Sequence, residues 1–295
     1  MASVIGDRAR DLSDRRVPFV QATVVRAQVP TSARAGDEAI VLTDGSIEGF
    51  VGGQCAENQV REAALGALTD GQALLLRVLP EGDVDFPDTP GAQVVVNPCL
   101  SGGALEIFLR PVLPPPLIAV LGTTPVADAV VAVSELLGYA TVRGHENTSE
   151  QWTLGAGAVV VASHGRGENA AIRQALDAGV GYVALVASGR RGAAVLDELD
   201  LGEPERSRVR TPAGLDIGAR TPPEIALSIM AEVVSVLNAA PAVIPSVVEI
   251  ESAVDPVCGM SVTILPSTPH LVVEGTDVWF CGDHCRATYA AKVGQ

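Results

Sequence analysis

Hydrophobic and polar positions divide the chain into regions with different periods. Up to about residue 110, short apolar runs alternate with glycine-containing and polar turns, which is typical of an α+β domain. From residue 117 on, short apolar runs alternate with longer segments of helical spacing. That alternation is typical of βα units on a parallel sheet. The sequence therefore predicts the α/β class, with an α+β domain over 1–110 and a Rossmann-like domain over 117–238.

The clearest unit of the second region begins with the apolar run Leu117-Ile-Ala-Val-Leu-Gly122. After Thr123 and Thr124, the segment 125–137 has helical spacing, opens on Pro125 and stops before a glycine. Proline suits a first helical turn, because the N–H that it lacks would have no partner there. A buried strand, a glycine turn and a helix form the first βα unit of a nucleotide-binding type of domain.

The remaining elements follow from the same patterns. In the first region, two short runs flank Asp44-Gly45, which is a strong hairpin signal. Further strands are expected over 19–25, 72–79, 93–96 and 104–109, a helix over 56–68, and a short helix or a frayed start over 1–16. In the second region we expect strands over 139–143, 158–162 and 182–187, helices over 169–178 and 222–237, and a short helix ending near 199. Thr221 and Glu224 form a capping box before the last helix.

Two proline-containing segments, 111–116 and 239–252, read as linkers, because proline is stiff and lacks an N–H donor. The second linker leads to a small module over 253–295 that contains three of the five cysteines. An odd number of cysteines, clustered in this way, favours metal or thiol chemistry over disulfides in a reducing compartment.

The charge balance of the chain limits the classes of partner that it can bind. With 20 basic and 35 acidic residues, the formal net charge of −15 argues against nucleic acid or an anionic membrane as the main partner. No apolar run is long enough to span a membrane, and the charged first twenty residues do not resemble a signal peptide. We therefore expect a cytoplasmic protein without a membrane span.

Two glycine loops of the first region carry cysteines. Gly52-Gly53 precedes Cys55, and Cys99 precedes Ser101, Gly102 and Gly103. Paired glycines can bring backbone N–H groups close to an anion such as a phosphate or a molybdate oxygen. The cysteines could serve as soft ligands for molybdenum or as carriers of sulfur. The alternative is two tight turns with small buried cysteines.

The Rossmann-like region offers weaker candidates. The single Gly122 cannot reproduce a glycine-rich pyrophosphate loop, so dinucleotide binding is in doubt. Arg190 and Arg191 could clamp a phosphate. The other candidates are Glu146, which follows Gly122 by 24 residues and could bind a ribose, His164 and Arg166 in a loop after the third strand, and Asp216 with Arg220, which could equally form a structural ion pair.

In the C-terminal module, Cys281 and Cys285 flank His284, and Cys258 lies upstream in Asp255-Pro-Val-Cys258-Gly-Met260. Three thiolates suit zinc or copper(I). His284 is a candidate fourth ligand, although a residue adjacent to Cys285 often points elsewhere. The alternative is a small fold with reduced cysteines and no metal.

Taken together, four segments in this order resemble the signatures of the xanthine dehydrogenase accessory family, the XdhC/CoxI type, over roughly residues 17–238. They are Phe50-Val-Gly-Gly-Gln-Cys-Ala-Glu57, Asn97-Pro-Cys-Leu-Ser-Gly-Gly-Ala-Leu-Glu106, Tyr182-Val-Ala-Leu-Val-Ala-Ser-Gly-Arg-Arg191 and Gly214-Leu-Asp-Ile-Gly-Ala-Arg-Thr-Pro222-Pro223. The module at the end resembles a YHS domain, with Gly282 in place of the usual serine and Trp279 in place of a usual tyrosine.

The resemblance implies a maturation factor rather than a catalyst. Such a protein holds molybdenum cofactor, assists its sulfuration with a cysteine desulfurase as partner, and delivers it to a molybdenum hydroxylase such as xanthine or carbon monoxide dehydrogenase. A homodimer is compatible with that role. The residues expected to contact the cofactor are the two glycine–cysteine loops, Gly122, Arg190, Arg191 and Asp216. Two alternatives remain: an NAD(P)-dependent oxidoreductase, and a metal or redox sensor that uses the cysteine module.

Overall fold

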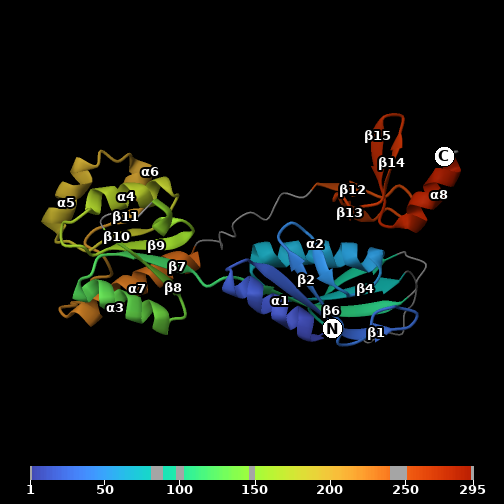
Figure 1. Cartoon of the computed structure of the whole chain (residues 1–295), viewed down its shortest axis with the longest axis horizontal. Coiled ribbons are helices and arrows are strands. Elements are labelled where there is room, and N and C mark those ends of the chain that lie inside the picture. Colours follow the sequence, from blue (N-terminus) through green and yellow to red (C-terminus); the bar gives the residue numbers. More distant parts are fainter. Residues whose placement is uncertain (1, 81–88, 98–102, 146–149, 240–250, 294–295) are drawn as a thin grey trace. The chain divides into compact units, whose positions relative to one another are not determined.

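A computed structural model describes residues 2–80, 89–97, 103–145, 150–239 and 251–293 (Figure 1). The chain divides into two compact units. The first joins Met1–Pro114 with Ile244–Gln295, and the second is Pro115–Val243. The C-terminal cysteine module therefore belongs to the same compact unit as the N-terminal α+β region. Within the described residues, no helix is both long enough and apolar enough to cross a membrane.

The first unit is built on a six-stranded sheet with the order β3-β2-β1-β6-β4-β5. Its pairs are antiparallel except β4 with β5. The strands are β1 (Phe19–Gln28), β2 (Glu38–Leu42), β3 (Ile47–Gly49), β4 (Leu74–Pro80), β5 (Gln93–Asn97) and β6 (Ala104–Val112). The predicted hairpin at Asp44-Gly45 is confirmed, because β2 pairs antiparallel with β3.

The two faces of this sheet are covered by different helices, α1 (Ala2–Asp14) and α2 (Gln54–Asp70) (Figure 1). Two consecutive residues of β1 show why. Val20 belongs to the large core that includes Val60 and Leu68 of α2, whereas Phe19 packs in a smaller cluster with Leu12 of α1. The period of two along the strand therefore supplies an apolar layer to each helix.

The prediction of a linker over 111–116 is partly wrong. β6 continues through Pro111 to Val112, and Pro111 lies opposite Val20 of β1. The pairing of β6 with β4 ends at Leu109, so Pro111 lies where one side of β6 has no neighbouring strand. A proline is tolerated there because no ladder N–H is required on that side.

The second unit contains a five-stranded parallel sheet with the order β11-β10-β9-β7-β8. Its strands are β7 (Leu117–Leu121), β8 (Ala140–Gly144), β9 (Ala156–Val161), β10 (Val183–Leu185) and β11 (Val209–Arg210). Its helices are α3 (Pro125–Leu136), α4 (Glu168–Asp177), α5 (Gly189–Glu198), α6 (Glu203–Arg206) and α7 (Pro222–Ala239), with a 3-10 turn η1 at Glu150–Thr153.

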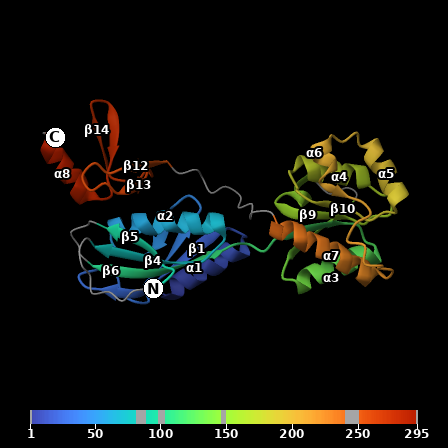
Figure 2. The ribbon, with the colours of Figure 1, turned by 180° about the vertical axis from the view of Figure 1, so that it is seen from behind.

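Both faces of the parallel sheet are buried (Figure 2). Along β7, Ile118 and Val120 face the core shared with α3 and α7, while Ala119 and Leu121 face the core shared with α4 and α5. This explains the near-continuous apolar strands of the sequence. The predicted Rossmann-like parallel sheet is therefore confirmed. The sequence does not predict the short elements η1, α6 and β11, because each is too short to show a hydrophobic period.

The cysteine module consists of two antiparallel hairpins and a helix. The hairpins are β12 (Ser252–Val254) with β13 (Ser261–Thr263), and β14 (His270–Val273) with β15 (Thr276–Trp279). The helix α8 is Asp283–Val293. The core of the module is small, and two of its five buried apolar residues are Cys281 and Cys285.

Candidate functional site

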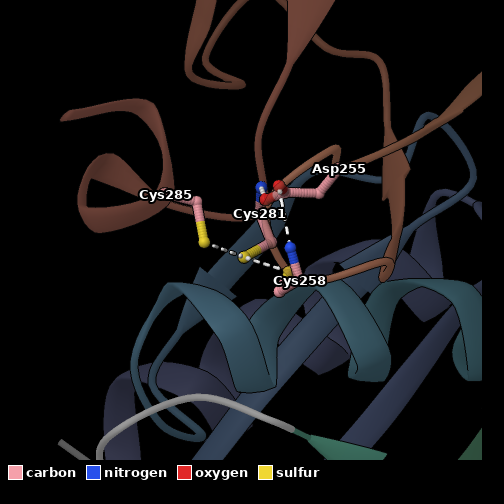
Figure 3. Close-up of side chains that lie close together, drawn as sticks. All are labelled: Asp255, Cys258, Cys281 and Cys285. Carbon is pink, nitrogen blue, oxygen red and sulfur yellow. Dashed lines mark hydrogen bonds between the residues drawn. The ribbon is translucent and has the colours of Figure 1, made fainter. Parts of the chain in front are cut away.

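The three cysteines of the C-terminal module lie together (Figure 3). The Sγ atom of Cys281 is 3.5 Å from that of Cys258 and 3.6 Å from that of Cys285. Cys258 comes from the turn before β13, Cys281 follows β15, and Cys285 lies in the first turn of α8. The Asp255 carboxylate completes a group whose ligand atoms all lie within 4.8 Å of one another.

Asp255 is fully buried and organises this group. One carboxylate oxygen accepts the N–H of Val257 at 2.8 Å, and the other accepts the N–H of Cys281 at 2.8 Å. Burial alone would raise the pKa of Asp255, but these N–H donors lower it below its ordinary value. The carboxylate thus ties the two loops that present Cys258 and Cys281. The sequence signal that could have found it is Asp-Pro-x-Cys, since aspartate often caps such a turn.

The spacing of the sulfur atoms fits a thiolate-bound metal. Zinc with Zn–S bonds of about 2.3 Å in a tetrahedral site separates its sulfurs by about 3.8 Å. The observed separations are slightly shorter, so small side-chain rotations would admit the ion. Burial raises the pKa of the Cys285 thiol to about 12, so this thiol is protonated at neutral pH unless a cation replaces the proton.

His284 lies at the start of α8 with an exposed side chain, and it is not part of the group within 4.8 Å. Its role as a fourth ligand is therefore not favoured by this geometry. Metal binding by Cys258, Cys281 and Cys285 remains a prediction, and the structure brings these three residues together.

The loop Gly52-Gly53 leads directly into α2. Gly53 is the N-cap residue of α2 and has no side chain to cap the helix, and its carbonyl accepts the Ala56 N–H at 2.9 Å. Gly52 has φ +139°, and a Cβ there would lie 2.9 Å from the Cβ of Ala56. Cys55 lies in the first turn of α2.

Only the last residue of the second glycine loop, Gly103, is described. A Cβ at Gly103 would lie 2.8 Å from the backbone N of Thr31, so the chain passes close to that segment here. Cys99, Ser101 and Gly102 lie outside the described residues. Their expected contact with a cofactor stays a prediction.

Gly122 lies at the switch point of the parallel sheet, between β7 and β9, where nucleotides usually bind. It has φ +117°, and a Cβ there would lie 2.3 Å from the carbonyl oxygen of Ala162. The Thr124 hydroxyl donates to that same carbonyl at 2.9 Å and accepts the Ala127 N–H at 3.1 Å. The start of α3 is therefore packed directly against the end of β9. Glu146, the expected ribose ligand, lies outside the described residues.

The two arginines expected to clamp a phosphate lie at the start of α5. Arg191 forms an ion pair with the buried Glu168, whose other oxygen accepts the Gly165 N–H at 2.8 Å, while Arg190 is exposed. A hollow of roughly 260 Å³ adjoins this pair and is also lined by Glu198. Two carboxylates against one guanidinium give a phosphate little attraction. The phosphate role of Arg191 stays a prediction that would require the arginine to leave Glu168.

His164 and Asp216 occupy exposed loops of the same unit. His164 follows β9 with φ +53° and an exposed side chain. Asp216 lies in the loop before α7, and it and Arg220 are both exposed. Arg220 donates its N–H to Glu224 at 2.8 Å, and Thr221 donates to the same oxygen at 2.9 Å, as expected for the glutamate of a capping box. Nothing in the described residues pairs the Asp216 carboxylate with the Arg220 guanidinium.

The loop before α7 is anchored by Glu232. Its carboxylate accepts the Tyr182 hydroxyl at 2.7 Å and the Gly214 N–H at 3.1 Å. Burial and this carboxylate both raise the pKa of Tyr182, so the hydroxyl remains a donor. Two of the sequence motifs, at Tyr182 and at Gly214, therefore meet through the half-buried side chain of Glu232.

Comparisons with known proteins agree with this architecture. The model of the XdhC and CoxI family matches residues 12–78, and the model of the XdhC Rossmann domain matches residues 118–233. The uncharacterized protein YqeB of Escherichia coli (strain K12) is 30% identical over 259 residues, which is 79% of this chain and 46% of that protein. The chain thus spans about half the length of this relative.

A crystal structure described as a xanthine dehydrogenase from Bacillus halodurans is also similar, with 14% identity and a TM-score of 0.39 over 80% of this chain and 96% of that chain. The two family models together match more than half of the chain, one in each compact unit. The chain therefore belongs to the XdhC and CoxI family.

Proposed function

We propose that the chain is an accessory protein of molybdenum hydroxylases, which holds molybdenum cofactor and assists its sulfuration and insertion into a client such as xanthine or carbon monoxide dehydrogenase. The observation that carries this proposal is the match of both family models to the two units. A cysteine desulfurase would supply the sulfur. The chain would act as a binding protein rather than as a catalyst.

The loop at the start of α2 fits the anionic end of such a cofactor. Gly52 and Gly53 keep side chains away from the first-turn N–H groups, and α2 is long enough, with 17 residues, to favour negative charge at its start. The cofactor would supply a pterin phosphate and a molybdenum centre. Here Gly53 and the first turn of α2 would bind the phosphate, and Cys55 would lie beside it as a soft ligand.

The oxidoreductase alternative is less well supported. A dinucleotide needs close backbone access at the switch point, yet Gly122 is packed against Ala162, and Thr124 already caps α3. We therefore expect anaerobic titration of the purified chain to show binding of molybdenum cofactor or of a pterin phosphate, without hydride transfer from NADH. Micromolar binding of NAD(H) with reduction of a carbonyl substrate, and no binding of a pterin, would contradict the proposal.

A second prediction concerns the two loop cysteines. Cys55→Ser and Cys99→Ser should each lower the activity and the cofactor content of a co-expressed molybdenum hydroxylase while the chain remains folded. Serine is similar in size, but it is a harder and far less acidic ligand than cysteine. Client activity and client cofactor content, measured beside circular dichroism of the accessory chain, test this. If both variants activate the client fully, the two cysteines have only a structural role and the cofactor is bound elsewhere.

For the cysteine module we propose one zinc or copper(I) ion per chain, bound by Cys258, Cys281 and Cys285. The sulfur separations of 3.5 and 3.6 Å support this assignment. The ion would join loops that the small core of the module holds only weakly, since a short segment buries little apolar surface. A sensor function, in which the occupied site alters the rest of the first unit, is supported by a hydrogen bond from Asn58 of α2 to the carbonyl of Cys281.

A further inference from the structure

The side chain of Asn58 connects helix α2 to the cysteine site. Its Nδ2 donates to the carbonyl oxygen of Cys281 at 3.0 Å across 223 positions of sequence. Asn58 is only 8% exposed, so this hydrogen bond is shielded from water. Cys281 is the middle one of the three cysteines, within 3.6 Å of both neighbouring sulfurs. The N-terminal region therefore contacts the cysteine site at its central residue.

Arg61 fixes the orientation of Asn58. Its Nη1 donates to Oδ1 of Asn58 at 2.6 Å, and its Nε donates to the carbonyl of Gly45 in the β2–β3 turn at 2.7 Å. Arginine can only donate, so the amide oxygen of Asn58 must face Arg61 and its NH₂ group must face Cys281. Burial lowers the pKa of the Arg61 guanidinium, while the nearby Glu57 raises it. A buried cation is thus used to orient one amide.

The peptide groups of Cys281 are held on both sides. Its N–H donates to Asp255 at 2.8 Å, and its carbonyl accepts from Asn58. The next turn adds a contact, since the Asp283 N–H donates to the Gln54 side chain at 3.3 Å. Gln54 and Asn58 are four residues apart and share one face of α2. With both peptide groups held, the direction of the Cys281 side chain depends on α2 as well as on the module itself.

We propose that Asn58, oriented by Arg61, is a positioning residue of the metal centre, so that a zinc or copper(I) ion at the cysteine module is bound by the module and α2 as one unit. This rests on the proposed metal site. Partners that orient metal ligands typically change metal affinity 10- to 100-fold when they are removed. The metal would in turn stabilise the first turn of α2, which follows the Gly52-Gly53 loop and contains Cys55.

The test uses the full chain and Zn²⁺ in competition with a chromophoric chelator. Asn58→Leu removes both hydrogen bonds. Asn58→Asp keeps the size and the acceptor for Arg61 but loses the donor to Cys281. We expect either variant to bind Zn²⁺ about 10- to 100-fold more weakly than the wild type. We also expect the absorption spectrum of bound Co²⁺ to change, because this spectrum reports the geometry of the ligands around the ion rather than the stability of the fold. Asn169→Leu is the control. It removes a hydrogen bond from an asparagine side chain to Glu198 in the second unit, and it should leave both the zinc affinity and the cobalt spectrum unchanged.

Circular dichroism establishes that each variant is folded before the comparison. Wild-type zinc affinity and an unchanged cobalt spectrum in a folded Asn58→Asp variant would overturn the inference, even if Asn58→Leu binds weakly, because the donor would then be dispensable. If the wild-type chain binds neither Zn²⁺ nor Co²⁺, the proposed metal site fails and the inference fails with it. A wild type that binds metal and variants that bind equally well would refute the role of Asn58 alone.

Discussion

Replacing Cys281 with serine in the full chain is expected to lower its zinc affinity by about 100- to 1,000-fold. Zinc-finger peptides bind zinc with about 10–16 kcal/mol, which is about 2.5–4 kcal/mol for each of their four ligands. Each 1.4 kcal/mol corresponds to a tenfold change in affinity. Cys281 is the residue whose sulfur approaches both other sulfurs, so no remaining pair of cysteines retains the same geometry.

Competition with a chelator measures the affinity, and proton release on zinc uptake gives an independent signal, because the protonated Cys285 thiol must lose its proton. His284→Ala is the matched control. Its side chain is exposed at the start of α8, so this variant should bind zinc like the wild type. Strong binding by Cys281→Ser, or loss of binding in His284→Ala alone, would show that the ligands have been assigned wrongly.

Gly122→Ala should lower the free energy of unfolding of the second unit by about 3 kcal/mol or more. Two costs combine. Alanine is strained at φ +117°, and its Cβ would lie 2.3 Å from the backbone oxygen of Ala162, which cannot move without displacing the end of β9. The substitution therefore affects both the glycine turn and the neighbouring strand.

Urea unfolding followed by tryptophan fluorescence measures this change. Trp152 is buried in the second unit, and a Trp279→Phe background leaves it as the only tryptophan of the chain. Gly138→Ala is the control, because Gly138 also has a positive φ of +78°, but no heavy atom lies within 4 Å of the added Cβ. That variant should cost only about 1–2 kcal/mol. Equal losses in the two variants would mean that the contact with Ala162 is relieved at no cost.

Elements with a local signal could be predicted from the sequence. The strand before Gly122 and the helix at Pro125 follow from an apolar run, a glycine and a proline in direct succession, and Thr124 indeed caps α3. The Asp44-Gly45 hairpin is equally local. The cysteines at 258, 281 and 285 form a cluster in sequence, and the structure brings them together in space. In each case, neighbouring residues carry the information.

Features that depend on distant partners could not be predicted in this way. The sequence predicts that a linker starts at Pro111. The structure instead places Pro111 in β6, beyond the end of its pairing with β4, and residues 111–116 alone carry no information about where β4 ends. Asn58 and Arg61 are ordinary polar residues of a helix until Cys281 and the Gly45 carbonyl are brought to them. Arg191 is predicted as free for a phosphate because its partner, Glu168, lies 23 positions earlier in the chain.

The order of the two units along the chain has a consequence for synthesis on the ribosome. The second unit, Pro115–Val243, is inserted between the two segments of the first. When the sheet and α2 have left the ribosome, Asn58 and Gln54 cannot yet form their hydrogen bonds with residues 281–283, because these residues are synthesised after the whole second unit. During that interval, Asn58 and Gln54 lack the partners that Cys281 and Asp283 provide in the folded chain. The hydrogen bonds that join α2 to the cysteine module therefore form only after the second unit has been synthesised.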